Sequence, residues 1–207
     1  MEKEHIVGAF DDDLDRIENE ILEMGKLVKK QIRAATNALL EMEIEEVDSL
    51  IANDRQINGM NKNINTLAEQ MIAMRQPMAL DLRLALMATS IATELERLGD
   101  HAKSTAKRIR RLSDVTPEKH IMTLIEKMSD VVTAMLTSAL KAYKKKDIEK
   151  AAEVRVKDAE VDDINDEIFK VAIKAIKENP EDIETLIHII LLSRNFERAG
   201  DHIVNIA

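Results

Sequence analysis

The sequence predicts an all-α protein built from two repeated three-helix bundles, and three observations support this prediction. Its 207 residues are 33% charged and 45% hydrophobic but only 2% aromatic, with five glycines and three prolines, a composition typical of helical proteins. The hexapeptide frame Glu96–His101 recurs 101 residues later as Glu197–His202, with five of six positions identical. The prolines at 77, 117 and 180 each separate long periodic segments, where helix ends tolerate them.

The periodic segments predict six long helices with short connections, which favours a bundle. The expected helices cover residues 10–41, 44–74, 79–111, 119–145, 148–177 and 182–207. Because the duplicated frame lies half a chain length apart, we expect a duplicated structural unit. The first bundle is expected at residues 1–114 and the second at 115–207, related by a pseudo-twofold axis. Two such bundles are favoured over one continuous six-helix array.

The third and sixth helices each carry an apolar stripe and a carboxylate pair. In the third helix the stripe has steps of three and four residues and is expected to be buried. Its members are Leu84, Met87, Ile91, Leu95, Leu98, Ala102, Ala106 and Ile109. Glu96 and Asp100 share one side of that helix, and Glu197 and Asp201 share one side of the sixth. At 100° per residue, both pairs are expected to face outward.

The second and fifth helices each have an aspartate inside an apolar seam. The seams are Ile44, Val47, Leu50, Asp54, Ile57, Met60 and Ile64, and Ile148, Ala151, Val154, Asp158, Val161, Ile164 and Ile168. A shift of 104 residues aligns Asp54 with Asp158 and Asn58 with Asp162. A carboxylate near a seam costs free energy unless it is paired, hydrogen-bonded or bound to a metal. Each repeat therefore offers two helices with oxygen ligands at i, i+4 spacing.

Clustered oxygens in a chain without cysteine suit cations such as magnesium, manganese, calcium or iron. The alternative is neutralisation by neighbouring arginines, namely Arg55, Arg97, Arg155 and Arg198. Gly99 and Gly200 lie in helix interiors, which suggests close backbone approach or space for a ligand beside the acids. His101 and His202 diverge by 100° from the adjacent acids and are expected at the rim.

Composition and motifs exclude several other classes. The net charge of −9 argues against nucleic acid as the main partner. The scattered glycines form no phosphate-binding loop, and the one Glu-x-x-His spacing, Glu2 to His5, lies in the expected frayed start. The start also lacks the features of a secretory signal, and no apolar stretch reaches the ~18 residues of a membrane span. We therefore expect a soluble, cytoplasmic protein.

Taken together, these residues resemble the PhoU family, the accessory proteins of phosphate-specific transport systems. The resemblance covers essentially the whole chain and rests on the doubled Glu-Arg-x-Gly-Asp frame. It extends to Asp54-x-x-Ile57-Asn58, Arg75-Gln76-Pro77 and Asp81-Leu82-Arg83 in the first half, and to Asp158-x-x-Val161-Asp162 and Ser193 to Ala207 in the second.

The resemblance implies a regulator without enzymatic activity, made of two three-helix bundles. Such proteins act between the phosphate ABC importer, through its ATPase subunit, and a sensor histidine kinase, and they keep the phosphate regulon off when phosphate is plentiful. They often form homodimers and reach the membrane only peripherally, through partners. Their acidic motifs bind divalent or trivalent metal ions (iron, manganese, magnesium or zinc) in multinuclear clusters. By position, the matching ligands are Glu96, Asp100, Glu197, Asp201, Asp54, Asn58, Asp158 and Asp162.

Two departures from the motif weaken the first site. Ser104 stands where the second repeat has Asn205, and Asn58 stands where it has Asp162. The resemblance also implies a last helix that continues beyond Ala207. Two other functional classes remain open: a carboxylate-bridged metalloenzyme on a helical bundle, and a purely structural helical scaffold.

Overall fold

A computed structural model describes residues 2–112 and 118–207, with side chains described for 10–43, 45–112 and 118–207. Six long helices and two short 3-10 helices follow one another, and the described residues contain no strand. The elements are α1 (Glu2–Leu40), η1 (Ile44–Glu46), α2 (Val47–Arg75), α3 (Leu80–Ile109), α4 (Lys119–Lys145), α5 (Ile148–Glu178), η2 (Pro180–Asp182) and α6 (Ile183–Ile206). The predicted all-α fold class is confirmed. Pro117 and the predicted boundary between residues 114 and 115 lie outside the described residues.

Local chemistry sets several helix ends. α2 stops because Gln76, just before Pro77, adopts a left-handed conformation with φ 49°, and its N–H donates to the Ile72 carbonyl. α4 stops in the same way at Lys146, where φ is 53°. α5 begins at Asp147, whose side chain accepts a hydrogen bond from the Lys150 N–H at 2.9 Å. These caps place the turns that fold each bundle back on itself.

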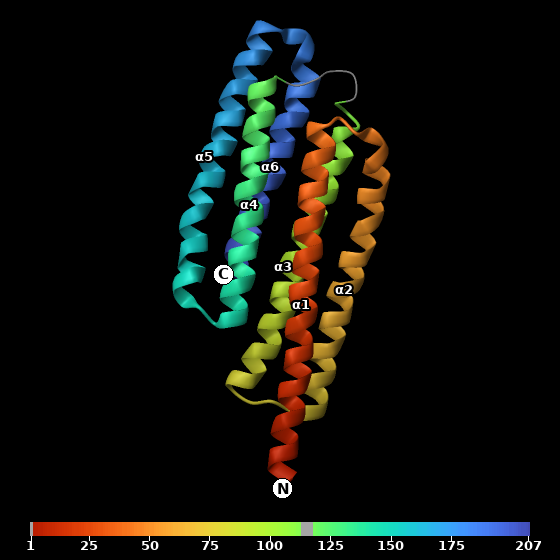
Figure 1. The fold of residues 1–207 in the computed structure, drawn as a ribbon, viewed down its shortest axis with the longest axis vertical. Helices are drawn as coiled ribbons and strands as arrows, with labels where there is room; N and C mark the ends of the chain where they lie inside the picture. Colours follow the sequence, from red (N-terminus) through yellow and green to blue (C-terminus); the bar gives the residue numbers. More distant parts are fainter. Residues whose placement is uncertain (1, 113–117) are drawn as a thin grey trace.

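The helices form two three-helix bundles, α1–α3 and α4–α6, which lie side by side (Figure 1). α3 packs against α6 and α1 packs against α4, so these helices join the two bundles. The buried apolar residues of both halves form one continuous cluster. α2 and α5 lie on the outside, where each keeps a solvent-exposed face (Figure 1).

The repeated histidines meet where α3 packs against α6. The rings of His101 and His202 are stacked with centroids 5.2 Å apart. His202 Nδ1 lies 2.7 Å from Glu94 Oε2, to which Asn205 Nδ2 also donates at 3.2 Å. Burial and the neighbouring His202 lower the pKa of His101. The histidine of the repeated frame therefore joins the two repeats.

Two residues expected in the core are exposed. Met87 of α3 is 46% exposed because the buried stripe at this end of the helix passes through Ala85 and Ala88 instead. Ile148 is 83% exposed because it is the first residue of α5, whose buried face begins at Val154. The side chain of Ile44 lies outside the described set.

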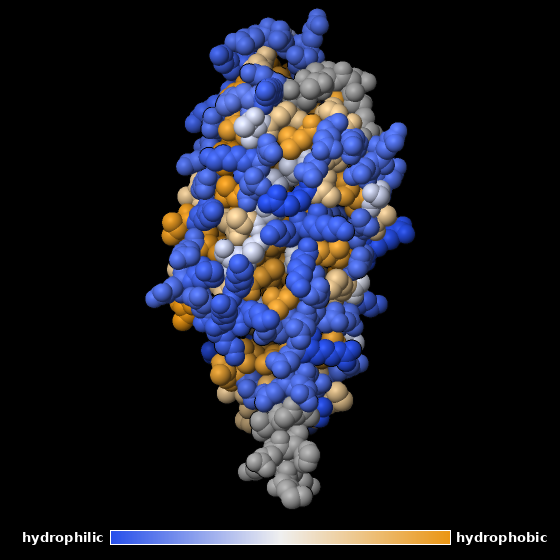
Figure 2. All heavy atoms as spheres, in the orientation of Figure 1, coloured by the Kyte–Doolittle hydropathy of each residue, from blue (hydrophilic) through white to orange (hydrophobic). Residues whose placement is uncertain are grey.

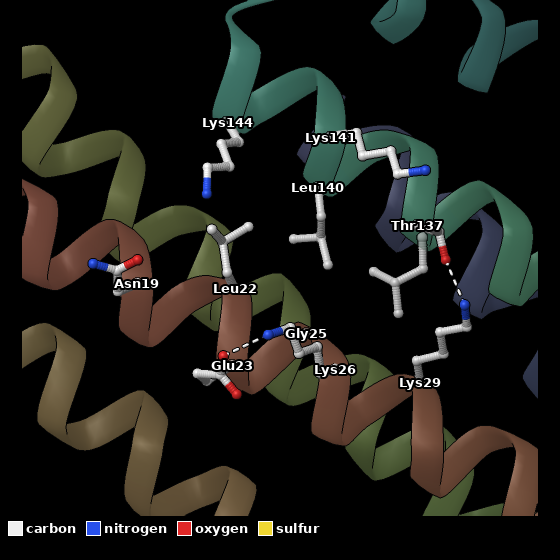
Figure 3. Close-up of a pocket in the computed structure, with 11 residues that line it drawn as sticks. Asn19, Leu22, Glu23, Gly25, Lys26, Lys29, Thr137, Leu140, Lys141 and Lys144 are labelled. Carbon is white, nitrogen blue, oxygen red and sulfur yellow. Dashed lines mark hydrogen bonds and ion pairs between the residues drawn. The ribbon is translucent and has the colours of Figure 1, made fainter.

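The face shown in Figure 2 is mostly hydrophilic, with small hydrophobic patches between the hydrophilic residues. No helix in the described part of the chain is both long enough and apolar enough to span a membrane. Between α1 and α4 lies a pocket of about 340 Å³ whose apolar floor includes Leu22 and Leu140 and whose rim carries lysines (Figure 3). At its rim, Lys26 pairs with Glu23 and Lys29 donates to Thr137.

Candidate metal sites on the two acidic helix pairs

In the first repeat, a lysine lies between the acids of α2 and α3. Lys103 Nζ is 2.7 Å from Asp54 Oδ2 and 2.5 Å from Asp100 Oδ1. Asn58 Nδ2 donates to the same Asp54 oxygen at 3.2 Å. Asp54 is only 4% exposed, so this ammonium neutralises a carboxylate that burial would otherwise penalise.

In this first cluster, burial and neighbouring charges shift the pKa values of Lys103 and Glu96. Burial alone would lower the pKa of Lys103, but its hydrogen bonds to Asp100 and Asp54 outweigh that effect and raise it. The pKa of Glu96 is raised by burial and by repulsion from Asp100 and Asp54. The lysine thus remains an ammonium at neutral pH and fills the position between Asp54 and Asp100 that a cation would take.

In the second repeat, the matching acids lie together without such a lysine, since Val204 stands at the position equivalent to Lys103. The pKa of Asp158 is raised from 3.8 to about 6 by burial and by repulsion from Asp162 and Asp201. The pKa of Asp162 is raised by burial and then by Asp201. α5 and α6 therefore bring three of the predicted aspartates within electrostatic reach of one another.

Gly200 is what allows Asp158 to lie against α6. A Cβ atom built on Gly200 would be 2.5 Å from Asp158 Oδ1, closer than a real Cβ contact. In the first repeat, Gly99 faces Ile57 instead, whose Cδ1 would lie 2.9 Å from such a Cβ. The interior glycines of the repeated frame therefore mark close approach between neighbouring helices, and only the second one touches the acidic cluster.

The expectation that Glu197 faces outward is wrong. Glu197 is only 9% exposed, its Oε1 accepts an ion pair from Arg194 at 2.8 Å, and its Oε2 is buried with no partner among the described residues. The angle between Glu197 and the apolar stripe of α6 does not include contacts with the other helices. Because α6 packs against α3, α4 and α5, its exposed face is narrower than that of a helix packed on one side. Burial raises the pKa of Glu197, although Arg194 opposes this rise.

The four arginines considered as an alternative to a metal form no ion pair with the predicted acids among the described residues, and Arg97 lies 3.5 Å from Glu94 instead. The positive charges of Arg97 and Arg198 nevertheless oppose the rise in the pKa of Glu96 and of Glu197. The ion pairs made by predicted site residues within the described part of the chain come from Lys103 and Arg194. Both lie three residues from a predicted acid on the same helix, and this i, i+3 spacing was the available signal.

The two clusters differ in how well they fit a metal ion. Among the described residues, no three histidine or acidic side chains converge in a ready-made coordination geometry. The first cluster already holds an ammonium between Asp54 and Asp100, so it fits a metal poorly. The second combines mutually repelling aspartates with the unpartnered Glu197 Oε2. Its carboxylate oxygens are the donors that hard cations prefer.

The family assignment follows from comparison with known proteins. The PhoU domain model matches twice, over residues 21–109 and 125–207, so each match covers one helical repeat. The chain belongs to the PhoU family. A "Phosphate-specific transport system accessory protein PhoU homolog" from Caulobacter vibrioides is 32% identical over 99% of this chain and 89% of that relative. A protein of the same name from Clostridium acetobutylicum is 34% identical over 95% of this chain and 90% of its own length.

Solved structures of the family share the whole architecture. PhoU from Pseudomonas aeruginosa superposes with a TM-score of 0.90 at 31% identity, covering 95% of this chain and 94% of that one. The phosphate transport system regulatory protein PhoU from Streptococcus pneumoniae gives a TM-score of 0.88 at 27% identity, over 95% and 92% of the two chains. The predicted PhoU-like fold is therefore confirmed.

Proposed function

We propose that this chain is a regulatory adaptor of phosphate uptake and signalling, which represses the phosphate regulon. It would act between the ATPase subunit of the phosphate ABC importer and the sensor histidine kinase, as a cytoplasmic homodimer and without bond-making chemistry of its own. The observation that carries this proposal is the match of both repeats to the PhoU family over nearly the full chain. The structural relative described as a phosphate transport system regulatory protein supports the regulatory role.

The same proposal includes a metal at the second repeat. Asp158, Asp162, Asp201 and Glu197 would hold it. A hard cation such as magnesium, manganese or iron would offset the burial and the mutual repulsion that raise the pKa of Asp158 and Asp162. When bound, the metal supplies positive charge to an acidic face. That face could then contact an anionic partner surface without like-charge repulsion.

A deletion strain of the source organism tests the regulatory role. Alkaline phosphatase should become constitutive in phosphate-rich medium and return to repression when the wild-type gene is restored. Normal repression in the deletion strain would contradict the proposal.

The metal is tested separately by elemental analysis of purified protein after reconstitution. The double variant Asp158→Asn/Asp201→Asn should lose most of the bound metal, because it removes two of the four donors. The matched variant Glu96→Gln/Asp100→Asn, at the cluster that holds Lys103, should keep it. Equal metal content in the wild type and in both variants would show that the second cluster does not hold the metal.

A further inference from the structure

A hollow at one end of the molecule is lined by cationic side chains from the end of α3 and the residues that follow it. It has a volume of about 1080 Å³, and its walls come from the start of α2, the end of α3 and the start of α6. Lys107, Arg108, Arg110 and Arg111 line it, together with His188 of α6. Among the described residues of the lining, the acids are Asp48 and Glu184. The hollow is therefore locally positive in a chain whose net charge is −9.

Few of these cations have partners within the described residues. Arg110 forms an ion pair with Asp48, and His188 Nε2 lies 4.0 Å from Glu184. Arg108 Nε and His188 Nδ1 are both buried without a hydrogen-bond partner among the described residues. A buried donor without an acceptor costs about 1–3 kcal/mol, so the Arg108 Nε–H indicates a missing acceptor in this hollow, and His188 Nδ1 adds a second buried polar atom without a partner.

Complementation of the helix dipole explains only part of this arrangement. Cations are favoured at the C-terminal end of α3 because the helix dipole is negative there. That effect does not account for the buried, unpartnered Nδ1 of His188 near the start of α6, nor for a hollow shared by three helices. The lysine-rimmed pocket between α1 and α4 differs, because Lys26 and Lys29 bond to Glu23 and Thr137 and no polar side-chain atom of its described lining is buried without a partner (Figure 3).

We propose that this hollow binds a small anion that carries several phosphate groups. Guanidinium groups match phosphate oxygens bidentately, and three arginines and a lysine could contact more than one group at once. The volume exceeds what a single phosphate needs. Because salt screens charge beyond about 8–10 Å, these cations, and not the net charge of −9, set the field inside the hollow. This site is independent of the proposed metal and goes beyond the adaptor role.

Titration calorimetry of the full chain with tripolyphosphate tests the proposal, using protein freed of metal by a chelator that is then removed. One tripolyphosphate should bind per chain, more tightly than inorganic phosphate or sulfate, and its affinity should fall as salt rises. The variant Arg108→Gln/Arg111→Gln should bind at least about tenfold more weakly, since charge-assisted hydrogen bonds to two side chains are lost.

The control variant Arg16→Gln/Arg83→Gln removes the same charge from arginines outside the hollow and should bind within about twofold of wild type. Arg111→Gln alone changes an exposed side chain, so it keeps the test valid if Arg108→Gln disturbs folding. No binding by the wild type, or an equal loss in both double variants, would overturn the proposal. So would binding of sulfate or a hexaglutamate peptide as tight as that of tripolyphosphate.

Discussion

Replacing Asp158 with asparagine should stabilise the metal-free protein, and the gain should depend on pH. The folded state raises the pKa of this carboxyl from 3.8 to about 6. A raised pKa means that the fold favours the protonated acid. Its contribution to stability is therefore fully present below about pH 3.8 and is lost as pH rises through 6. The substituted amide would stay neutral throughout, so the variant avoids this loss.

The size of the gain follows from the pKa difference. Two pKa units correspond to an upper bound of about 3 kcal/mol. Asp158 is partly exposed, and solvent screening reduces the measurable gain at pH 8 to about 1 kcal/mol. For a chain of 207 residues, this gain raises Tm by about 2–4 °C.

Urea denaturation at pH 4 and pH 8, with a chelator present, measures this gain. It should appear at pH 8, shrink at high salt and nearly vanish at pH 4. Asp163→Asn removes the same charge from an exposed neighbour on α5 and should gain less. An equal gain at both pH values, or a loss at pH 8, would refute the assignment of a raised pKa to Asp158 from its burial and from repulsion within this cluster. Added metal should reverse the order, because it stabilises only a protein that binds it.

Three further substitutions test the same structural reasoning by chemical denaturation. Lys103→Met should lower the free energy of unfolding by about 2–3 kcal/mol, because Asp54 stays buried without its cation. Wild-type stability of this variant would show that the ammonium is dispensable. Gly200→Ala should destabilise by about 1 kcal/mol despite the helix preference of alanine, because the new Cβ displaces Asp158, and a gain would contradict that contact. Gly59→Ala should instead raise the free energy of unfolding by about 0.5–1 kcal/mol, because nothing lies within 4 Å of its Cβ position. A lower free energy of unfolding would contradict the open space beside Gly59.

The helices and the repeat could be predicted from sequence because they depend on local patterns. Apolar residues at steps of three and four define each long helix, and Pro77 and Pro180 lie at connections that the structure confirms. The burial of Asp54 could also be predicted, because an aspartate inside an apolar seam must face the neighbouring helix.

The failed expectations share one physical cause, which is contact between helices that no single-helix pattern contains. Glu197 is buried because α6 has neighbours on three sides. Met87 is exposed because the neighbours of α3 contact a stripe through Ala85 and Ala88. Lys103 reaches Asp54 on another helix, a contact 49 residues away in sequence that depends on the packing of α2 on α3.

Both repeats bring carboxylates close together, and they differ in how the repulsion between these carboxylates is compensated. Both place an aspartate of an outer helix against acids of the helix that packs on it, and like charges in a partly buried setting repel strongly. In the first repeat, Lys103 supplies one positive charge between Asp54 and Asp100 as part of the chain, whatever the solution contains. In the second repeat, Val204 supplies none, and burial together with repulsion from Asp162 and Asp201 raises the pKa of Asp158 to about 6. The second cluster has no such internal cation, so the repulsion among its aspartates is the greater one, and it is the cluster at which the proposed metal would change the surface charge more.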